Sequence, residues 1–193
     1  MKKTLSFFIL FLTGAQAYCQ SKNNVSLVFG VGSNGIYNSG IGAAGFAGKG
    51  ETVFGLRYTR RLTGALAIET GIEYASDRLL WDYEDAYDPN FTPQRVNIRM
   101  LSIPVYANIT FLKYLFVDGG FMLDLETSHK PGGIAPRQDG IGLGGGIGGK
   151  YSFGHLSLFV NPFLQAHSMI AFHNEGGGRL LNSGVKFGVG FSF

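Results

Sequence analysis

The sequence has little of what defines several large classes of protein. It has one cysteine, Cys19, so no disulfide can form within the chain and no cysteine-based metal site can be built. Only 15% of the residues are charged, and no uninterrupted apolar run reaches the roughly 18 residues of a transmembrane helix. An apolar repeat of helical period is lacking as well. These absences leave β-strands as the elements to look for.

The charges do not point to a nucleic-acid partner. The chain has 16 Lys and Arg residues against 13 Asp and Glu residues. Lys2 and Lys3 belong to an N-terminal leader, and the other 14 basic residues nearly balance the acidic ones. Nucleic-acid binding would need a concentrated basic patch. The sequence therefore predicts no nucleic-acid partner.

The first residues have the organisation of a secretory signal peptide. Two lysines precede an apolar run over residues 5–12, and the small-x-small sequence Ala15-Gln16-Ala17 follows. We expect a signal peptide over residues 1–17, with cleavage after Cys19 as the alternative. Lipidation of Cys19 is not expected, because the bulky Tyr18 stands where a lipoprotein signal has a small residue.

The final stretch, residues 181–193, shows a pattern that recurs along the chain. Its alternate positions are mostly apolar, whereas the positions between them are small or polar. This period of two is typical of a β-strand with one apolar face. The 30 glycines are roughly twice the usual share of ~7%, and 14% of the residues are aromatic. Behind a secretory leader, such repetition indicates a membrane barrel whose apolar face meets lipid.

Eight segments alternate in this way, and their lengths are close to the ~9–11 residues that a tilted strand needs to cross a bilayer. They lie near residues 25–32, 52–59, 65–75, 96–109, 115–125, 141–151, 156–166 and 181–193. The connections between them alternate strictly between long and short, as in barrels with long outer loops and short periplasmic turns. We predict an all-β, eight-stranded antiparallel up-and-down transmembrane β-barrel over residues 20–193. A soluble lipocalin-like barrel is the alternative fold.

Two local features are also predicted. The apolar phase slips between Met100 and Leu101, which suggests a β-bulge. Glycines on the inner face are expected to make room for Phe116, Phe159 and Phe163 in a narrow interior.

Six charged residues fall on the face predicted to line the lumen. They are Arg57, Glu69, Glu73, Asp118, Asp124 and Lys186. An eight-stranded interior is just wide enough for side chains to fill, and unpaired buried charges are costly. We therefore predict an ion-paired plug in which Arg57 and Lys186 face carboxylates, with Glu69 and Glu73 as the candidates. An ion path gated by the same charges is the alternative.

Chemical motifs are weak in this sequence, and no catalytic, cofactor or metal residue is predicted. Two glycine runs, beginning at Gly30 and Gly140, match the dinucleotide fingerprint in spacing but are not followed by a helix pattern. His167 and Ser168 resemble in part the pair of the lipid A deacylase barrels, but the His-x-Ser-Asn arrangement is absent. The acidic, aromatic residues 82–90 could bind a divalent cation or a partner, but they do not match the EF-hand spacing, so a solvated loop is the preferred interpretation.

The whole chain resembles the small outer-membrane β-barrels. The residues that carry this resemblance are the leader ending Ala-Gln-Ala, the strand Leu101-Ser-Ile-Pro-Val-Tyr106 and the closing Phe187-Gly-Val-Gly-Phe-Ser-Phe193. It is similar in particular to the porin-family or PorT-like barrels of Bacteroidetes, and more distantly to OmpX and the OmpA barrel. The resemblance implies a cell outer-membrane location, contact with outer-membrane lipid, and recognition by the assembly machinery through Phe187, Val189, Phe191 and Phe193.

The resemblance also implies no shared catalytic residue and no cofactor. A structural or interaction role in the cell envelope follows as the prediction, with loops 76–94 and 126–139 presented to an envelope protein. A narrow porin or a secretion accessory is the first alternative, and a lipid-modifying enzyme is the second.

Overall fold

The computed structural model describes residues 23–38, 45–82, 92–129, 134–173 and 178–193. The predicted signal peptide and both of its cleavage sites lie outside these residues. Most of the acidic segment 82–90 and parts of the predicted loops 76–94 and 126–139 lie outside them as well.

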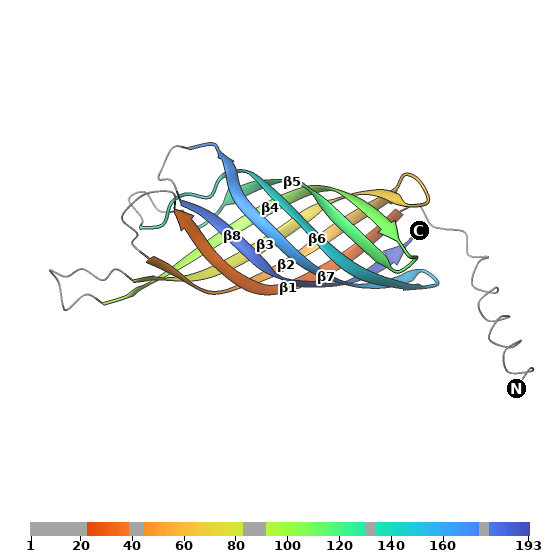
Figure 1. Cartoon of the computed structure of the whole chain (residues 1–193), viewed down its shortest axis with the longest axis horizontal. Helices are drawn as coiled ribbons and strands as arrows, with labels where there is room; N and C mark the ends of the chain where they lie inside the picture. Colours follow the sequence, from red (N-terminus) through yellow and green to blue (C-terminus); the bar gives the residue numbers. More distant parts are fainter. Residues whose placement is uncertain (1–22, 39–44, 83–91, 130–133, 174–177) are drawn as a thin grey trace, which may run out of the picture.

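The described chain forms a closed barrel of eight antiparallel strands, in which each strand pairs with its neighbours in the sequence (Figure 1). The strands are β1 Asn23–Asn38, β2 Gly45–Arg61, β3 Leu66–Asp82, β4 Gln94–Phe111, β5 Leu115–Glu126, β6 Gly140–Phe153, β7 Leu156–Ala171 and β8 Gly178–Ser192. The ring closes between the first and last strands, where Val25 lies opposite Phe191. The predicted eight-stranded up-and-down barrel is therefore confirmed.

The alternation of the sequence decides which side chains face outward. In β1, Leu27 is 55% exposed, whereas its neighbours Ser26 and Val28 are buried. Successive side chains of a strand point to opposite faces, so the apolar set forms the outer surface and the small or polar set lines the interior. In the described part of the chain, no helix has the length and hydropathy needed to cross a membrane.

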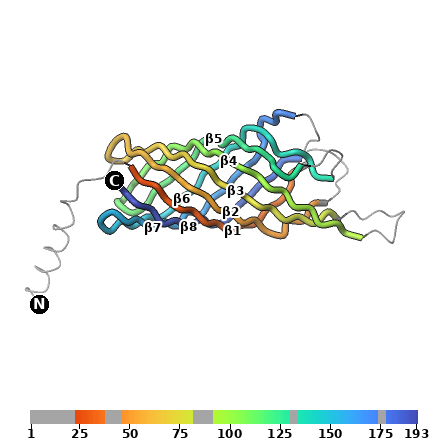
Figure 2. The backbone as a smooth tube through the Cα atoms, turned by 180° about the vertical axis from the view of Figure 1, so that it is seen from behind, coloured from red at the N-terminus to blue at the C-terminus, as the bar shows by residue number. Residues whose placement is uncertain are grey.

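The short connections all lie at the end of the barrel where the C-terminus lies, called here the short-turn end; the opposite end is the long-loop end (Figures 1 and 2). Exposed aromatic side chains gather at the short-turn end: Phe111, Tyr114, Tyr151, Phe153, Phe191 and Phe193. Some of them touch, since the rings of Tyr114 and Tyr151 stack at 5.8 Å. This belt has the form of an interfacial aromatic girdle.

The strands extend further toward the long-loop end than the sequence analysis expected. The predicted loop 76–94 is shorter, because β3 continues to Asp82 and β4 begins at Gln94. This hairpin projects beyond its neighbours (Figure 2). The prediction failed because it relied on apolar alternation, which ends with the apolar belt, whereas backbone pairing continues past it.

The predicted β-bulge between Met100 and Leu101 is wrong. The register of β3 with β4 is the same on both sides of this position, with Ala75 opposite Met100 and Tyr74 opposite Leu101. Met100 points inward, in phase with Ser102. The apparent slip arises because the interior itself is apolar at this level.

Register shifts occur elsewhere, between Gly48 and Glu51 in β2 and between Ile141 and Leu143 in the pairing of β6 with β7. At the second shift, Ser168 on β7 has a φ of 51°.

The inner glycines make room for aromatic rings, as expected for two of the three phenylalanines. A Cβ at Gly148 would lie 2.5 Å from the ring of Phe116, and one at Gly188 would overlap the ring of Phe159. These two rings meet edge to face with centroids 6.4 Å apart. Large rings thus fill the lumen opposite residues that have no side chain.

Candidate functional site

The middle of the lumen holds a buried network of charged side chains. All six predicted lumen residues, Arg57, Glu69, Glu73, Asp118, Asp124 and Lys186, point into the barrel and are at most 7% exposed. Five of them form one cluster across the interior, which we call the ion-pair layer: Arg57, Glu69, Glu73, Asp118 and Lys186.

Arg57 on β2 is the hub of the ion-pair layer. Its guanidinium lies 3.4 Å from Glu69, 3.1 Å from Glu73 and 3.8 Å from Asp118. One cation thus serves carboxylates from β3 and β5, and it also lies 5.3 Å from the ring of Phe159. A buried guanidinium with several partners is the arrangement that makes buried charge tolerable.

Lys186 on β8 completes the ion-pair layer. Its ammonium donates to Glu73 at 2.6 Å and lies over the ring of Phe163 at 4.5 Å. Neutral amides take up other oxygens, since Asn108 donates to Glu69 at 2.9 Å and Asn161 donates to Asp118 at 2.6 Å. The polar atoms of this level are therefore largely engaged with one another across the lumen.

Asp124 belongs to a separate group, nearer the long-loop end. One of its oxygens accepts a hydrogen bond from Ser102 at 2.6 Å, and the other lies 3.0 Å from Nδ1 of His167. Sequence reasoning placed His167 in a loop after β7, but it lies within β7 and is 1% exposed.

Further out, the lumen is closed by apolar side chains. Leu79, Ile98, Met100 and Leu180 form a fully buried cluster. The segment before β6 folds onto this end: Gln138 is buried and its side chain bonds to the backbone of both Gly178 and Leu180. Part of the predicted loop 126–139 thus seals the barrel and is not wholly presented outward.

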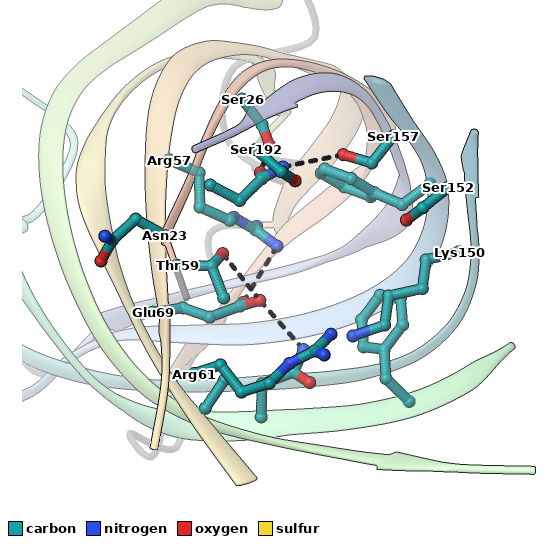
Figure 3. A pocket seen from close by; sticks show the side chains of 15 residues that line it. Asn23, Ser26, Arg57, Thr59, Arg61, Glu69, Lys150, Ser152, Ser157 and Ser192 are labelled. Atoms are coloured by element: carbon teal, nitrogen blue, oxygen red, sulfur yellow. Dashed lines mark hydrogen bonds and ion pairs between the residues drawn. The ribbon is translucent and has the colours of Figure 1, made fainter. Parts of the chain in front are cut away.

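At the short-turn end, a polar cavity of about 80 Å³ opens into the lumen (Figure 3). Its lining includes Arg57 and Glu69, so its floor is the ion-pair layer. Thr59 donates to Glu69 at 3.3 Å, and Lys150 donates to Thr110 at 2.7 Å. The cavity therefore reaches the paired charges of Arg57 and Glu69.

The structure does not assemble a serine hydrolase site from His167 and Ser168. The hydroxyl of Ser168 donates to the backbone oxygen of Asp139 at 3.2 Å. His167 has an acid partner in Asp124, which sequence reasoning missed, but Nε2 of the imidazole has no hydrogen-bond partner in the described structure. A base without an adjacent nucleophile cannot activate one.

The other sequence motifs do not form the sites that their spacing suggests. The two glycine runs lie within β1 and β6, so neither opens a helix as a dinucleotide site requires. Within the described ranges, no three His, Cys, Asp or Glu side chains are grouped closely enough to hold a metal ion by themselves.

The four residues of the predicted assembly signal all point outward on β8 or just after it. Phe187, Val189, Phe191 and Phe193 are each about half exposed, at 46%, 53%, 52% and 59%. The backbone of Phe193 is tied to that of Asn23 by hydrogen bonds of 3.0 Å and 3.3 Å.

Sequence reasoning missed a further polar group in the lumen: Glu51, Asp77, Asn34 and Asn182. Glu51 and Asp77 are buried at 2% and 0% exposure. Both fell in segments interpreted as loops. Continuing the inward phase of each strand by a few residues would have found them.

Solved structures that are similar to the barrel in fold include OprG and Ail. OprG, an outer membrane protein from Pseudomonas aeruginosa, matches with a TM-score of 0.54 over 90% of this chain and 97% of that chain, at 13% identity. Ail, the attachment invasion locus protein of Yersinia pestis, solved in complex with the heparin analogue sucrose octasulfate, matches with a TM-score of 0.50 over 88% of this chain and 99% of that chain, at 11% identity. No family model and no curated protein matches the sequence. The similarity is therefore one of fold.

Proposed function

We propose that this chain is an integral outer-membrane β-barrel with a structural or interaction role in the cell envelope. The observation that carries the proposal is the inverted distribution of polarity. Large apolar side chains such as Leu164, 69% exposed, and Phe121, 63% exposed, cover the outside, while Arg57 and Lys186 are buried inside. An apolar exterior around a polar lumen suits lipid, whereas a soluble barrel would have the opposite arrangement.

The filled lumen favours a structural role over transport. Eight strands leave an interior that side chains can fill, and an open diffusion pore needs about 16 strands. Here the ion-pair layer and the apolar cluster of Leu79, Ile98, Met100 and Leu180 lie in series along the lumen. The similarity in fold to OprG, an outer membrane protein, also supports the location.

The projecting hairpin of β3 and β4 is the surface that we propose for partner binding. Its outer face carries the exposed residues Arg78, Arg95 and Arg99, and Arg78 lies opposite Asn97 in the register. We infer an anionic envelope component as the partner, because arginine side chains pair with carboxylates and phosphates.

Fractionation tests the location. The full chain is expressed with its leader in a Gram-negative host, and the inner and outer membranes are separated. We expect the protein in the outer-membrane fraction, with faster gel migration before heating than after. Recovery in the soluble periplasmic fraction without a heat-dependent shift would mean a soluble barrel instead.

Site-specific photo-crosslinking in intact cells tests the interaction role. A photoreactive residue replaces Asn97 on the projecting hairpin, and a matched one replaces Lys113 in a turn at the opposite end. We expect a discrete adduct from position 97 only. The absence of any adduct from position 97 would contradict a role in binding through this hairpin.

A narrow, gated pore is the second candidate. The polar cavity at the short-turn end favours it, because that cavity reaches the ion-pair layer at Arg57. Replacing Arg57 and Lys186 by neutral residues distinguishes the two roles. A sharp rise in conductance would indicate a gated path, whereas a fall in stability alone would indicate a plug.

A further inference from the structure

Two buried carboxylates face each other in the outer half of the lumen. Glu51 on β2 and Asp77 on β3 are directly opposite in the register, and both point inward. Like charges directly opposite in a sheet are destabilising, and their burial adds to the cost. Something must therefore offset this pair in the folded barrel.

Most carboxylate oxygens of this pair have no hydrogen-bond partner among the described residues. Within the part of the chain that the structure describes, neither carboxylate oxygen of Glu51 has a hydrogen-bond partner within 3.5 Å, nor does Oδ2 of Asp77. The other oxygen of Asp77 already accepts hydrogen bonds from Asn34 at 2.9 Å and from Asn182 at 3.0 Å. Asn182 donates to Asp77 through its amide nitrogen, and its amide oxygen has no hydrogen-bond partner among the described residues.

The nearest basic groups are engaged elsewhere. Lys186 donates to Glu73 at 2.6 Å. His167 lies within electrostatic range of Glu51 and Asp77, but its Nδ1 is paired with Asp124. Glu51, Asp77 and Asp124 are thus three buried carboxylates served by one imidazole.

We propose that Glu51, Asp77 and Asn182 form a buried binding site for a hard divalent cation, Ca²⁺ or Mg²⁺. Four unpartnered oxygens from two carboxylates and one amide are the ligand type that such ions prefer, and bound water completes their coordination. Such a site uses the amide oxygen as its third protein ligand.

The surroundings are shaped for this site. Gly32 on β1 leaves the space that the carboxylate of Glu51 occupies, since a Cβ there would lie 3.0 Å from Oε2. Leu79 follows Asp77 by two positions and Leu180 precedes Asn182 by two, each on the same face of its strand, and both leucines close the site with apolar surface. A sealed site exchanges its ion slowly, so we expect the cation to enter as the barrel folds.

The test uses the mature chain refolded from denaturant into detergent micelles. Refolding is carried out in chelator-treated buffer at neutral pH with either no divalent ion, CaCl₂ or MgCl₂, and retained metal and thermal unfolding are then measured. We expect one retained ion per barrel and a higher unfolding temperature with it. Glu51→Gln and Asp77→Asn should each bind at least roughly tenfold more weakly.

Two comparisons make the result decisive. Without divalent ion, Glu51→Gln should unfold at a higher temperature than the wild type, because the like-charge pair is gone. Asp118→Asn, which removes a buried carboxylate of the ion-pair layer, should retain the ion as the wild type does. The proposal would be overturned if the barrel retained no ion and were stabilised only by acidification, which would mean that the two carboxylates share a proton. Unchanged ion binding in Glu51→Gln would also overturn it. The test is made in micelles and is independent of the proposed envelope role.

Discussion

The ammonium of Lys186 lies 2.6 Å from Oε2 of Glu73, although the two residues are 113 positions apart in the sequence. Both side chains are buried, and the other oxygen of Glu73 accepts a hydrogen bond from Arg57 at 3.1 Å. Glu73 thus has one cation on each oxygen, and it joins β2, β3 and β8 across the lumen. The stability of the barrel should depend on both contacts.

Replacing Lys186 by methionine should destabilise the barrel by about 3–5 kcal/mol, because the change leaves buried Glu73 with one cation fewer. Urea unfolding of the refolded protein, followed by gel migration and tryptophan fluorescence, measures the free energy. The double variant Lys186→Met, Glu73→Gln is the control and should recover part of the loss, since the unpaired charge is removed too. A single variant as stable as the wild type would show that the pair contributes nothing.

A methyl group at Gly148 should be poorly tolerated. It would lie 2.5 Å from the ring of Phe116, so Gly148→Ala should cost about 1–3 kcal/mol. Gly149→Ala is a matched control on the same strand, because its Cβ would meet nothing closer than 3.9 Å. Equal unfolding free energies for the two variants would contradict the packing described here.

The turn between β4 and β5 holds backbone strain that can be relieved. Leu112 and Lys113 have φ angles of 47° and 68°, which non-glycine residues rarely adopt. Replacing them by Asn and Gly should raise stability by about 1 kcal/mol, since asparagine and glycine adopt a positive φ at less cost than leucine and lysine. The converse change, Gly154→Ala, at a φ of 62° with no atom near its Cβ, should lower stability by a similar amount.

Phe193 should matter more for assembly in the cell than for stability. Phe193→Ser keeps the backbone bonds to Asn23 but removes the last residue of the proposed assembly signal. We expect less folded barrel in the outer membrane but unchanged refolding in micelles. Phe172→Ser is the control, since this phenylalanine is also half exposed but lies at the long-loop end. Equal losses for both variants would argue against a specific signal.

The strands could be predicted wherever the outward face is apolar, since alternation then marks each one. Their outer ends could not, because pairing continues where the outward face becomes polar, as at Arg78 and Asn97. The false β-bulge prediction has a related cause. Ile98 and Met100 are apolar but point inward, because the lumen changes from polar to apolar along its length.

The charged residues that line the lumen could be predicted from the sequence, but which cation meets which carboxylate could not. Counting alternate residues puts Arg57 and Lys186 on the inner face. Which carboxylate each one meets depends on ring closure and strand stagger, since Lys186 and Glu73 come from strands that are not neighbours. The facing pair Glu51 and Asp77 keeps the register of the remaining β2–β3 pairs as far as Arg61 and Ala67, but both residues lie beyond the apolar alternation that marks these strands in the sequence.

The most direct test of the closed lumen is the current through the refolded wild-type barrel in a planar lipid bilayer. A lumen filled by the ion-pair layer and sealed by apolar side chains predicts current at the level of the bare bilayer. The variant Lys186→Met, Glu73→Gln, which removes one buried pair, should stay closed as well, because Arg57 still meets Glu69 and Asp118. A steady, voltage-independent conductance of the wild-type protein would contradict the proposed plug and would make the barrel a pore.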